Sequence, residues 1–165
     1  MDQTTATPIS LLDAYAPSQI AMRVREVGVT KAAMPVLTMF ALAILAGAFI
    51  ALGALFYTVT VTTGNEVAVP FGFLRLAGGI TFSLGLVLVV VGGAELFTGN
   101  NLLAMAWADG KISSGEVLSN WVVVCATNFA GAAGLALLVY LSGHTGMGVM
   151  FVELASEAQG ALARL

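Results

Sequence analysis

The sequence predicts an all-α membrane protein with three spans, the second of which is a broken helix. Of the 165 residues, 59% are hydrophobic and only 9% are charged, and the mean hydropathy of +0.97 lies far from that of a soluble domain. Three apolar runs are each long enough to cross a bilayer as a helix. The second run contains a carboxylate followed by polar residues, and hydrocarbon tolerates non-helical backbone only where it is buried in protein or lines a wet cavity.

Residues 1–31 are expected to form a cytoplasmic N-terminal segment that contains an amphipathic helix. Pro17 suits the first turn of this helix, and Gly28 is expected to end it. The segment is too polar to span a membrane, which indicates an interfacial or partner-packing helix. Its basic residues outnumber those of the loop around residue 66, so the N-terminus is predicted to lie in the cytoplasm.

Residues 32–145 are predicted to hold the membrane spans. Their limits are about 35–61, 71–108 with a break near 98–101, and 117–141. Three crossings place residues 146–165, which are amphipathic at best, on the extracytoplasmic side. These last residues stop without a cap or a helix breaker, and we expect them to be the connecting tail of a truncated chain.

Small and polar residues recur within the spans at helical spacings. Ala43, Gly47 and Ala51 are four residues apart, and Gly78, Gly85 and Gly92 are seven apart. Such stripes favour close packing between helices. Asn120 and Asn128 are expected to make interhelical hydrogen bonds from one face of the third span. Phe82 and Leu86 share a stripe of the second span, and periodicity leaves open whether they belong to a core or narrow a pore.

The polar interruption lies within residues 92–103, Gly-Gly-Ala-Glu-Leu-Phe-Thr-Gly-Asn-Asn-Leu-Leu. A half-helix that starts near Asn101 would expose unpaired N–H groups and a positive dipole end, which suit a small anion. Thr98 adds a hydroxyl donor, and Gly99 permits a tight backbone turn. Glu95 would repel an anion in the path, so we expect it to accept hydrogen bonds from the broken backbone instead. The residues expected to shape the loop are Glu95, Gly99, Asn100 and Asn101.

Several function classes find no support in the sequence. No nucleophile, base and acid occur in a catalytic arrangement, so an enzyme is not expected. Cys125 is the only cysteine and His144 the only histidine, and no spacing suggests a metal site. We therefore expect no metal and no other cofactor. No basic cluster suggests nucleic acid, and the net charge of -3 is too small to imply an electrostatic partner.

The string from Gly93 to Asn100, Gly-Ala-Glu-Leu-Phe-Thr-Gly-Asn, resembles the signature of the formate/nitrite transporter family. The likeness extends through Pro70-Phe71-Gly72, the run from Gly78 to Leu86, and Asn120-Trp121. It is strongest to the formate-channel branch. The resemblance implies the first of two inverted repeats of an aquaporin-like six-span fold. It also implies a homopentamer in a bacterial cytoplasmic (inner) membrane, with one pore in each protomer for small monovalent anions such as formate, nitrite or hydrosulfide.

By position, the resemblance implies that Thr98 is the threonine of the loop that breaks the second span. Phe82, Leu86, Leu96 and Phe97 would be the apolar constrictions of the substrate pathway, and the N-terminal helix would help to gate the pore. The family's second repeat, with its central histidine, is missing, and His144 lies in a loop. We expect the full-length chain or another polypeptide to supply that repeat.

Two other functions remain compatible with these residues. One is a channel for water or small neutral solutes on the same architecture. The other is a three-span scaffold that does not transport, in which Glu95 and Thr98 only support packing.

Overall fold

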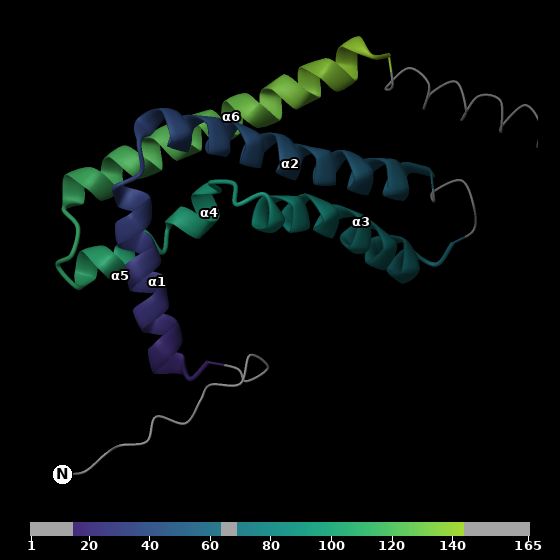
Figure 1. Ribbon diagram of the computed structural model, residues 1–165. Helices are drawn as coiled ribbons and strands as arrows, with labels where there is room; N and C mark the ends of the chain where they lie inside the picture. The colour runs from purple at the N-terminus through teal and green to yellow at the C-terminus, as the bar shows by residue number, and fades with distance from the viewer. Residues whose placement is uncertain (1–14, 64–68, 144–165) are drawn as a thin grey trace, which may run out of the picture.

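The computed structural model describes residues 15–63 and 69–143, and the secondary structure there is helical (Figure 1). The helices are α1 (Pro17–Ala32), α2 (Val36–Thr63), α3 (Phe71–Val91), α4 (Phe97–Asn100), α5 (Leu103–Ala108) and α6 (Ser114–Leu141). The predicted tail at 146–165 and His144 lie outside the described residues.

Three of the described helices are long and apolar enough to cross a membrane. The mean hydropathy of their spanning windows is 2.5 for α2, 2.1 for α3 and 2.1 for α6. The prediction of an all-α, multi-pass membrane protein is thereby confirmed. The predicted second span, 71–108, is divided among α3, α4 and α5.

Helix α2 lies in the middle of the bundle and packs against both α3 and α6 (Figure 1). Glycine allows the backbones to approach closely: a Cβ atom added at Gly47 would lie 2.0 Å from the carbonyl oxygen of Asn128. A Cβ atom added at Gly131 would lie 2.0 Å from the carbonyl oxygen of Ile44. Gly53 of α2 and Gly85 of α3 face each other in the same way. The small-residue stripes therefore serve helix packing, as the sequence predicts.

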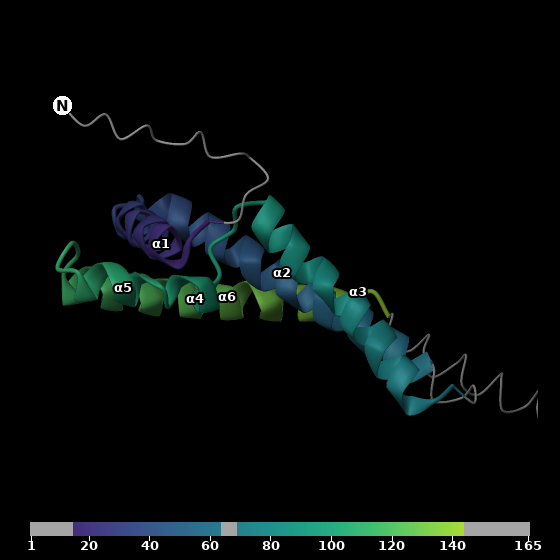
Figure 2. The same ribbon diagram turned by 90° about the horizontal axis from the view of Figure 1, so that it is seen from below.

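Helix α1 runs across one end of the bundle and packs against α5 (Figures 1 and 2). Pro17 is its first residue, as predicted. The prediction that Gly28 ends the helix is wrong, because α1 continues to Ala32. Gly28 is buried against α5 instead, where an added Cβ would lie 3.0 Å from Cβ of Ala106. The glycine thus permits a close contact, and the extra turn carries Lys31 toward the bundle.

A charged cluster ties α1 to the turn between α5 and α6. Nη1 of Arg25 lies 3.0 Å from Oδ1 of Asp109, and Nζ of Lys111 lies 3.4 Å from Oδ2. Partial desolvation raises the pKa of Asp109, but the hydrogen bonds and charges of Arg25 and Lys111 outweigh it and hold that pKa below its ordinary value. The carboxylate is therefore charged at neutral pH and able to hold α1.

Replacing Gly47 with Ala should lower the stability of the protein by about 1–3 kcal/mol, because the added methyl group collides with the backbone of α6. Thermal unfolding in detergent, followed by tryptophan fluorescence, measures the loss. Gly79→Ala is the matched control, since an added Cβ at Gly79 has no neighbour within 4 Å. Equal Tm values for the two variants would contradict the close packing of α2 and α6.

Candidate functional site

The backbone of the broken helix turns at Gly92 and Gly93. Helix α3 ends at Val91, and Gly93 adopts a φ of 60°, a left-handed conformation that favours glycine. Leu96 is extended (φ −98°, ψ 131°), and α4 begins at Phe97. The sequence predicts the break near 98–101, whereas the structure places the main break at residues 92–96. It lies earlier because the turn is made by the glycine pair.

The role predicted for Gly99 is not found. Gly99 lies inside the short helix α4, its φ is not positive, and an added Cβ would meet no atom within 4 Å. Free N–H groups are predicted near Asn101, but the amides of Asn101 and Leu102 are both hydrogen-bonded. The amide of Asn101 donates to the carbonyl of Phe97, and that of Leu102 donates to the carbonyl of Gly99. The chain thus passes from α4 to α5 with these amides satisfied.

Glu95 is buried in the break and paired. Its side chain is 5% exposed, and Oε1 accepts a hydrogen bond of 2.7 Å from Nζ of Lys31. Oε2 accepts a second, of 2.8 Å, from Nδ2 of Asn100. We predicted that Glu95 would accept hydrogen bonds from the broken backbone, but its partners are these two side chains. Its own N–H donates to the carbonyl of Leu42 in α2.

Lys31 completes a triangle with Glu95 and Asn100. Besides the ion pair, Nζ donates to Oδ1 of Asn100 at 2.9 Å. From the sequence we used Lys31 to assign topology and as part of the family resemblance at residues 28–31, and we missed its place in the site. One signal could have found it: a carboxylate inside an apolar run calls for a cation, and Lys31 is the basic residue next to the first span.

Helix α6 holds α4 through two further side chains. Nδ2 of Asn100 donates to Oδ1 of Asn120 at 2.9 Å, and both residues are almost completely buried. Nε1 of Trp121 donates to the carbonyl of Asn100 at 2.9 Å. Asn120 therefore makes the interhelical contact that the sequence predicts, and its partner belongs to α4, the short helix after the break.

Asn128 links α2, the break and α4. Its Nδ2 donates to the carbonyl of Ala43 at 2.7 Å and to that of Glu95 at 2.9 Å, while its Oδ1 accepts the N–H of Phe97 at 2.9 Å. One amide side chain thus supplies partners for both sides of the break. Buried backbone groups need such partners, because an unpaired one at this depth costs several kcal/mol.

The residues predicted to line a pathway are less buried than this network. Thr98 is exposed on α4, while Phe97 packs in part against Met39 and Val124. Leu96 is likewise half-buried, against the cluster formed by Ala46, Val89 and Ala94. On α3, Phe82 is 39% and Leu86 50% exposed. Asn101 is also exposed, and its side chain makes no hydrogen bond within residues 15–63 and 69–143.

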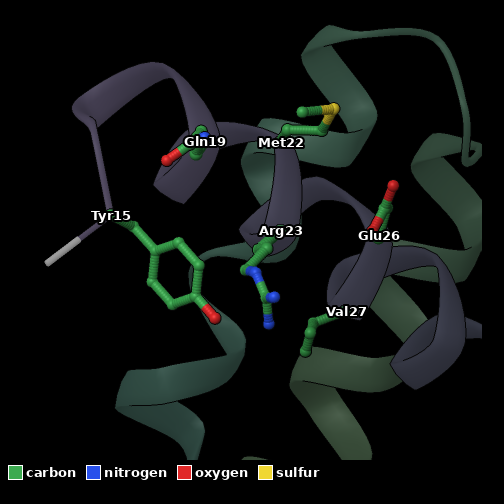
Figure 3. A pocket seen from close by; sticks show the side chains of 6 residues that line it. All are labelled: Tyr15, Gln19, Met22, Arg23, Glu26 and Val27. Atoms are coloured by element: carbon green, nitrogen blue, oxygen red, sulfur yellow. The ribbon is translucent and has the colours of Figure 1, made fainter. Parts of the chain in front are cut away.

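Two hollows lie beside α1. The smaller, of about 300 Å³, is bounded on one side by Lys31 and on the other by Gly99 and Leu102. The larger, of about 510 Å³, lies along the outer face of α1 (Figure 3). There the guanidinium carbon of Arg23 lies 4.2 Å from the centre of the Tyr15 ring. In the part of the chain that the structure describes, no group of His, Cys, Asp or Glu could hold a metal ion.

Comparison with known proteins gives a consistent result. Residues 18–163 match the family model described as formate/nitrite transporter. The chain is 46% identical over 132 residues to the formate channel FocA of Escherichia coli K12, which covers 80% of this chain and 46% of that protein. It is 41% identical over 134 residues to the formate channel BtFdhC of Bacillus thuringiensis, covering 80% of the chain and 49% of the relative.

A third relative, the formate channel FocA of Haemophilus influenzae, is 42% identical over 100 residues, which are 61% of this chain and 34% of that protein. These relatives are named as channels, not as enzymes. The chain spans about half the length, or less, of the curated relatives it matches.

Removing one partner of the buried ion pair should be costly. Lys31→Met and Glu95→Gln should each lower the stability by about 3 kcal/mol or more, because each change leaves a polar or charged partner unpaired. The double variant should be more stable than the sum of the two losses predicts. A double-mutant cycle by thermal unfolding measures this coupling, and strictly additive losses would show that the pair is not coupled.

Asn128→Ala should lower the stability by about 1–3 kcal/mol, since it leaves the N–H of Phe97 and the carbonyl of Glu95 without their partner. Asn101→Ala is the matched control, because that side chain is exposed. Urea or thermal unfolding compares the two variants. A larger loss at Asn101 than at Asn128 would refute the assignment of Asn128 to the support of the break.

Proposed function

Because the chain belongs to the formate/nitrite transporter family, we propose that it forms half of a pore for small monovalent anions, formate first among them. The observation that carries this proposal is the break at residues 92–96. Buried side chains hold the break on its protein side, and Thr98, in the helix that follows it, is exposed. Non-helical backbone at this depth in a membrane is typical of substrate paths.

Charge neutralisation makes the site compatible with an anion. An unpaired carboxylate at Glu95 would repel formate, but Nζ of Lys31 lies 2.7 Å from it and cancels its charge. The paired Glu95 therefore supports the loop and does not contact the substrate. In the same scheme Gly99 and Asn100 belong to the short helix α4 beyond the break, and Asn101 follows it. Of these three residues, only Asn100 bonds to Glu95.

Exposed and half-buried apolar side chains define the path that we propose. Phe82 and Leu86 narrow the path from α3, and Leu96 and Phe97 narrow it at the break. Apolar rings of this kind exclude hydrated ions, and Thr98 offers a hydroxyl donor to the anion that passes. Within residues 15–63 and 69–143, no hydrogen bond occupies the amides of Thr98 and Gly99, which leaves them available as further donors.

Membership of the family supports a proposal for the rest of the assembly. We propose a homopentamer with an aquaporin-like fold, in which a second repeat, from the full-length chain or another polypeptide, closes each pore opposite Thr98. The setting is a bacterial cytoplasmic membrane, with α1 on the cytoplasmic side. The concentration of basic residues on α1 and in the turn after α5 supports this orientation.

Thr98→Val should reduce formate flux about tenfold or more, because a hydrogen bond to a charged group is worth about 1.5–3 kcal/mol. The measurement is uptake of labelled formate into proteoliposomes that contain the complete protein with both repeats. Thr58→Val is the matched control, since the Thr58 hydroxyl donates to the carbonyl of Ala54 in its own helix.

Two results would count against the proposal. Unchanged flux in Thr98→Val would remove Thr98 from the path and favour a packing role. Fast water flux with no formate uptake by the unaltered protein would indicate a channel for water or neutral solutes.

A further inference from the structure

We propose that Arg75 captures anions at the mouth of the pore opposite α1 and so contributes to anion selectivity. The inference rests on the proposed function, because it takes the exposed stripe of α3 as the pathway. Arg75 lies in the second turn of α3, and the start of that helix is at the end of the bundle away from α1 and α5 (Figure 1).

Arg75 lies on the same stripe of α3 as the two proposed constrictions. A helix turns by about 100° per residue, so Phe82, seven residues on, and Leu86, eleven residues on, lie within about 20° of Arg75 around the axis. At about 1.5 Å per residue, they follow about 10 Å and 16 Å deeper. The glycines that pack against α2, Gly78 and Gly85, occupy the adjoining face.

Two neighbours hold the guanidinium group in place. Nη1 of Arg75 donates to the hydroxyl of Tyr57, and its Cζ lies 5.0 Å from the centre of the Phe71 ring. The Tyr57 ring in turn packs against Gly78, where an added Cβ would lie 2.8 Å from it. Arg has five N–H donors, so one hydrogen bond to Tyr57 leaves donors for an anion.

The charge of Arg75 has no counter-ion among the residues that the structure describes. Three of the other described basic residues contrast with it: Arg25 and Lys111 contact Asp109, and Lys31 contacts Glu95. Arg23, on α1, lies over the Tyr15 ring instead. The remaining described charges lie on α1, at the break or around the turn after α5. A fixed positive charge above an apolar stripe raises the local concentration of anions, and salt screens this effect.

A contact with a lipid phosphate is the main competing role for an exposed arginine near a helix end. The position of Arg75 favours the pore, because Arg75 shares one face of α3 with Phe82 and Leu86. The two roles differ in what they respond to. Anion capture depends on ionic strength in any lipid, whereas a headgroup contact depends on the lipid.

The test is formate uptake by the complete protein in phosphatidylcholine vesicles, as a function of formate concentration and at low and high ionic strength. Arg75→Gln should raise the apparent KM about tenfold at low ionic strength with little change in maximal flux. High salt should remove the difference, and Arg75→Lys should retain most of the affinity. Lys111→Gln, a basic residue at the other end of the bundle, is the control and should show no such change in KM.

Three outcomes would overturn the inference. In one, Arg75→Gln has the KM and salt dependence of the unaltered protein. In the second, its effect appears only when anionic phosphatidylglycerol is added. In the third, the effect disappears in a Glu66→Gln background, which would mean that Arg75 only neutralises Glu66, a residue outside the described ranges. Persistence of the effect in that background supports the inference.

Failure of this inference is separable from failure of the proposed function. If the unaltered protein takes up formate and Thr98→Val loses that uptake, an unchanged Arg75→Gln refutes the role of Arg75 alone. If the unaltered protein takes up no formate, the proposed function fails first.

Discussion

The ion pair between Lys31 and Glu95 is the contact on which the broken helix depends. An ionised carboxylate in an apolar bundle is costly unless it is paired and hydrogen-bonded. Glu95 meets both conditions, with Lys31 on one oxygen and Asn100 on the other. Since Lys31 lies in the last turn of α1, the N-terminal helix is a structural part of the site. Helix α1 is held against α5 by the close contact at Gly28 and against the following turn by the Arg25–Asp109 ion pair. This packing places Lys31 beside the break.

The backbone of the break is supported in a second way, by amide side chains from α6. Asn128 satisfies groups on both sides of the break, and Asn120 meets the Asn100 side chain. These residues can reach because α2 and α6 approach closely at Gly47 and Gly131. The polar network therefore depends on the close packing of the spans. A wider spacing between α2 and α6 would separate Asn128 from the carbonyl of Ala43.

Hydropathy was sufficient to predict the three spans, because length and apolar composition decide what can cross a bilayer. The glycine stripes likewise predicted close packing correctly. The position of the break was predicted too late in the chain, since Gly93 and Gly99 both lie in the interrupted stretch and only the backbone conformation shows which one makes the turn. Gly28 was misjudged for a related reason: a glycine that ends a helix and one that admits a neighbour look alike in sequence.

The candidate site was predicted only in part. Glu95 lies in the break and Asn100 shortly after it, and both were identified, but Lys31, 64 residues before Glu95, was not. Its pairing depends on how α1 packs, a tertiary contact that local patterns do not encode. The hydrogen bonds from Asn128 to the carbonyls of Ala43 and Glu95 also depend on tertiary packing, so the sequence did not predict them. Asn101 is the opposite case, a residue that we expected in the site and that the structure leaves out: its side chain is exposed.

Hydrogen–deuterium exchange of the complete protein in lipid nanodiscs tests the central claim most directly. If the Lys31–Glu95 pair holds the break, the hydrogen-bonded amides of Ala94, Glu95, Phe97 and Asn100 are protected in the unaltered protein. In Lys31→Met they should exchange much faster, while α2 and α6 keep their protection. Unchanged protection of these four amides in Lys31→Met would contradict the account.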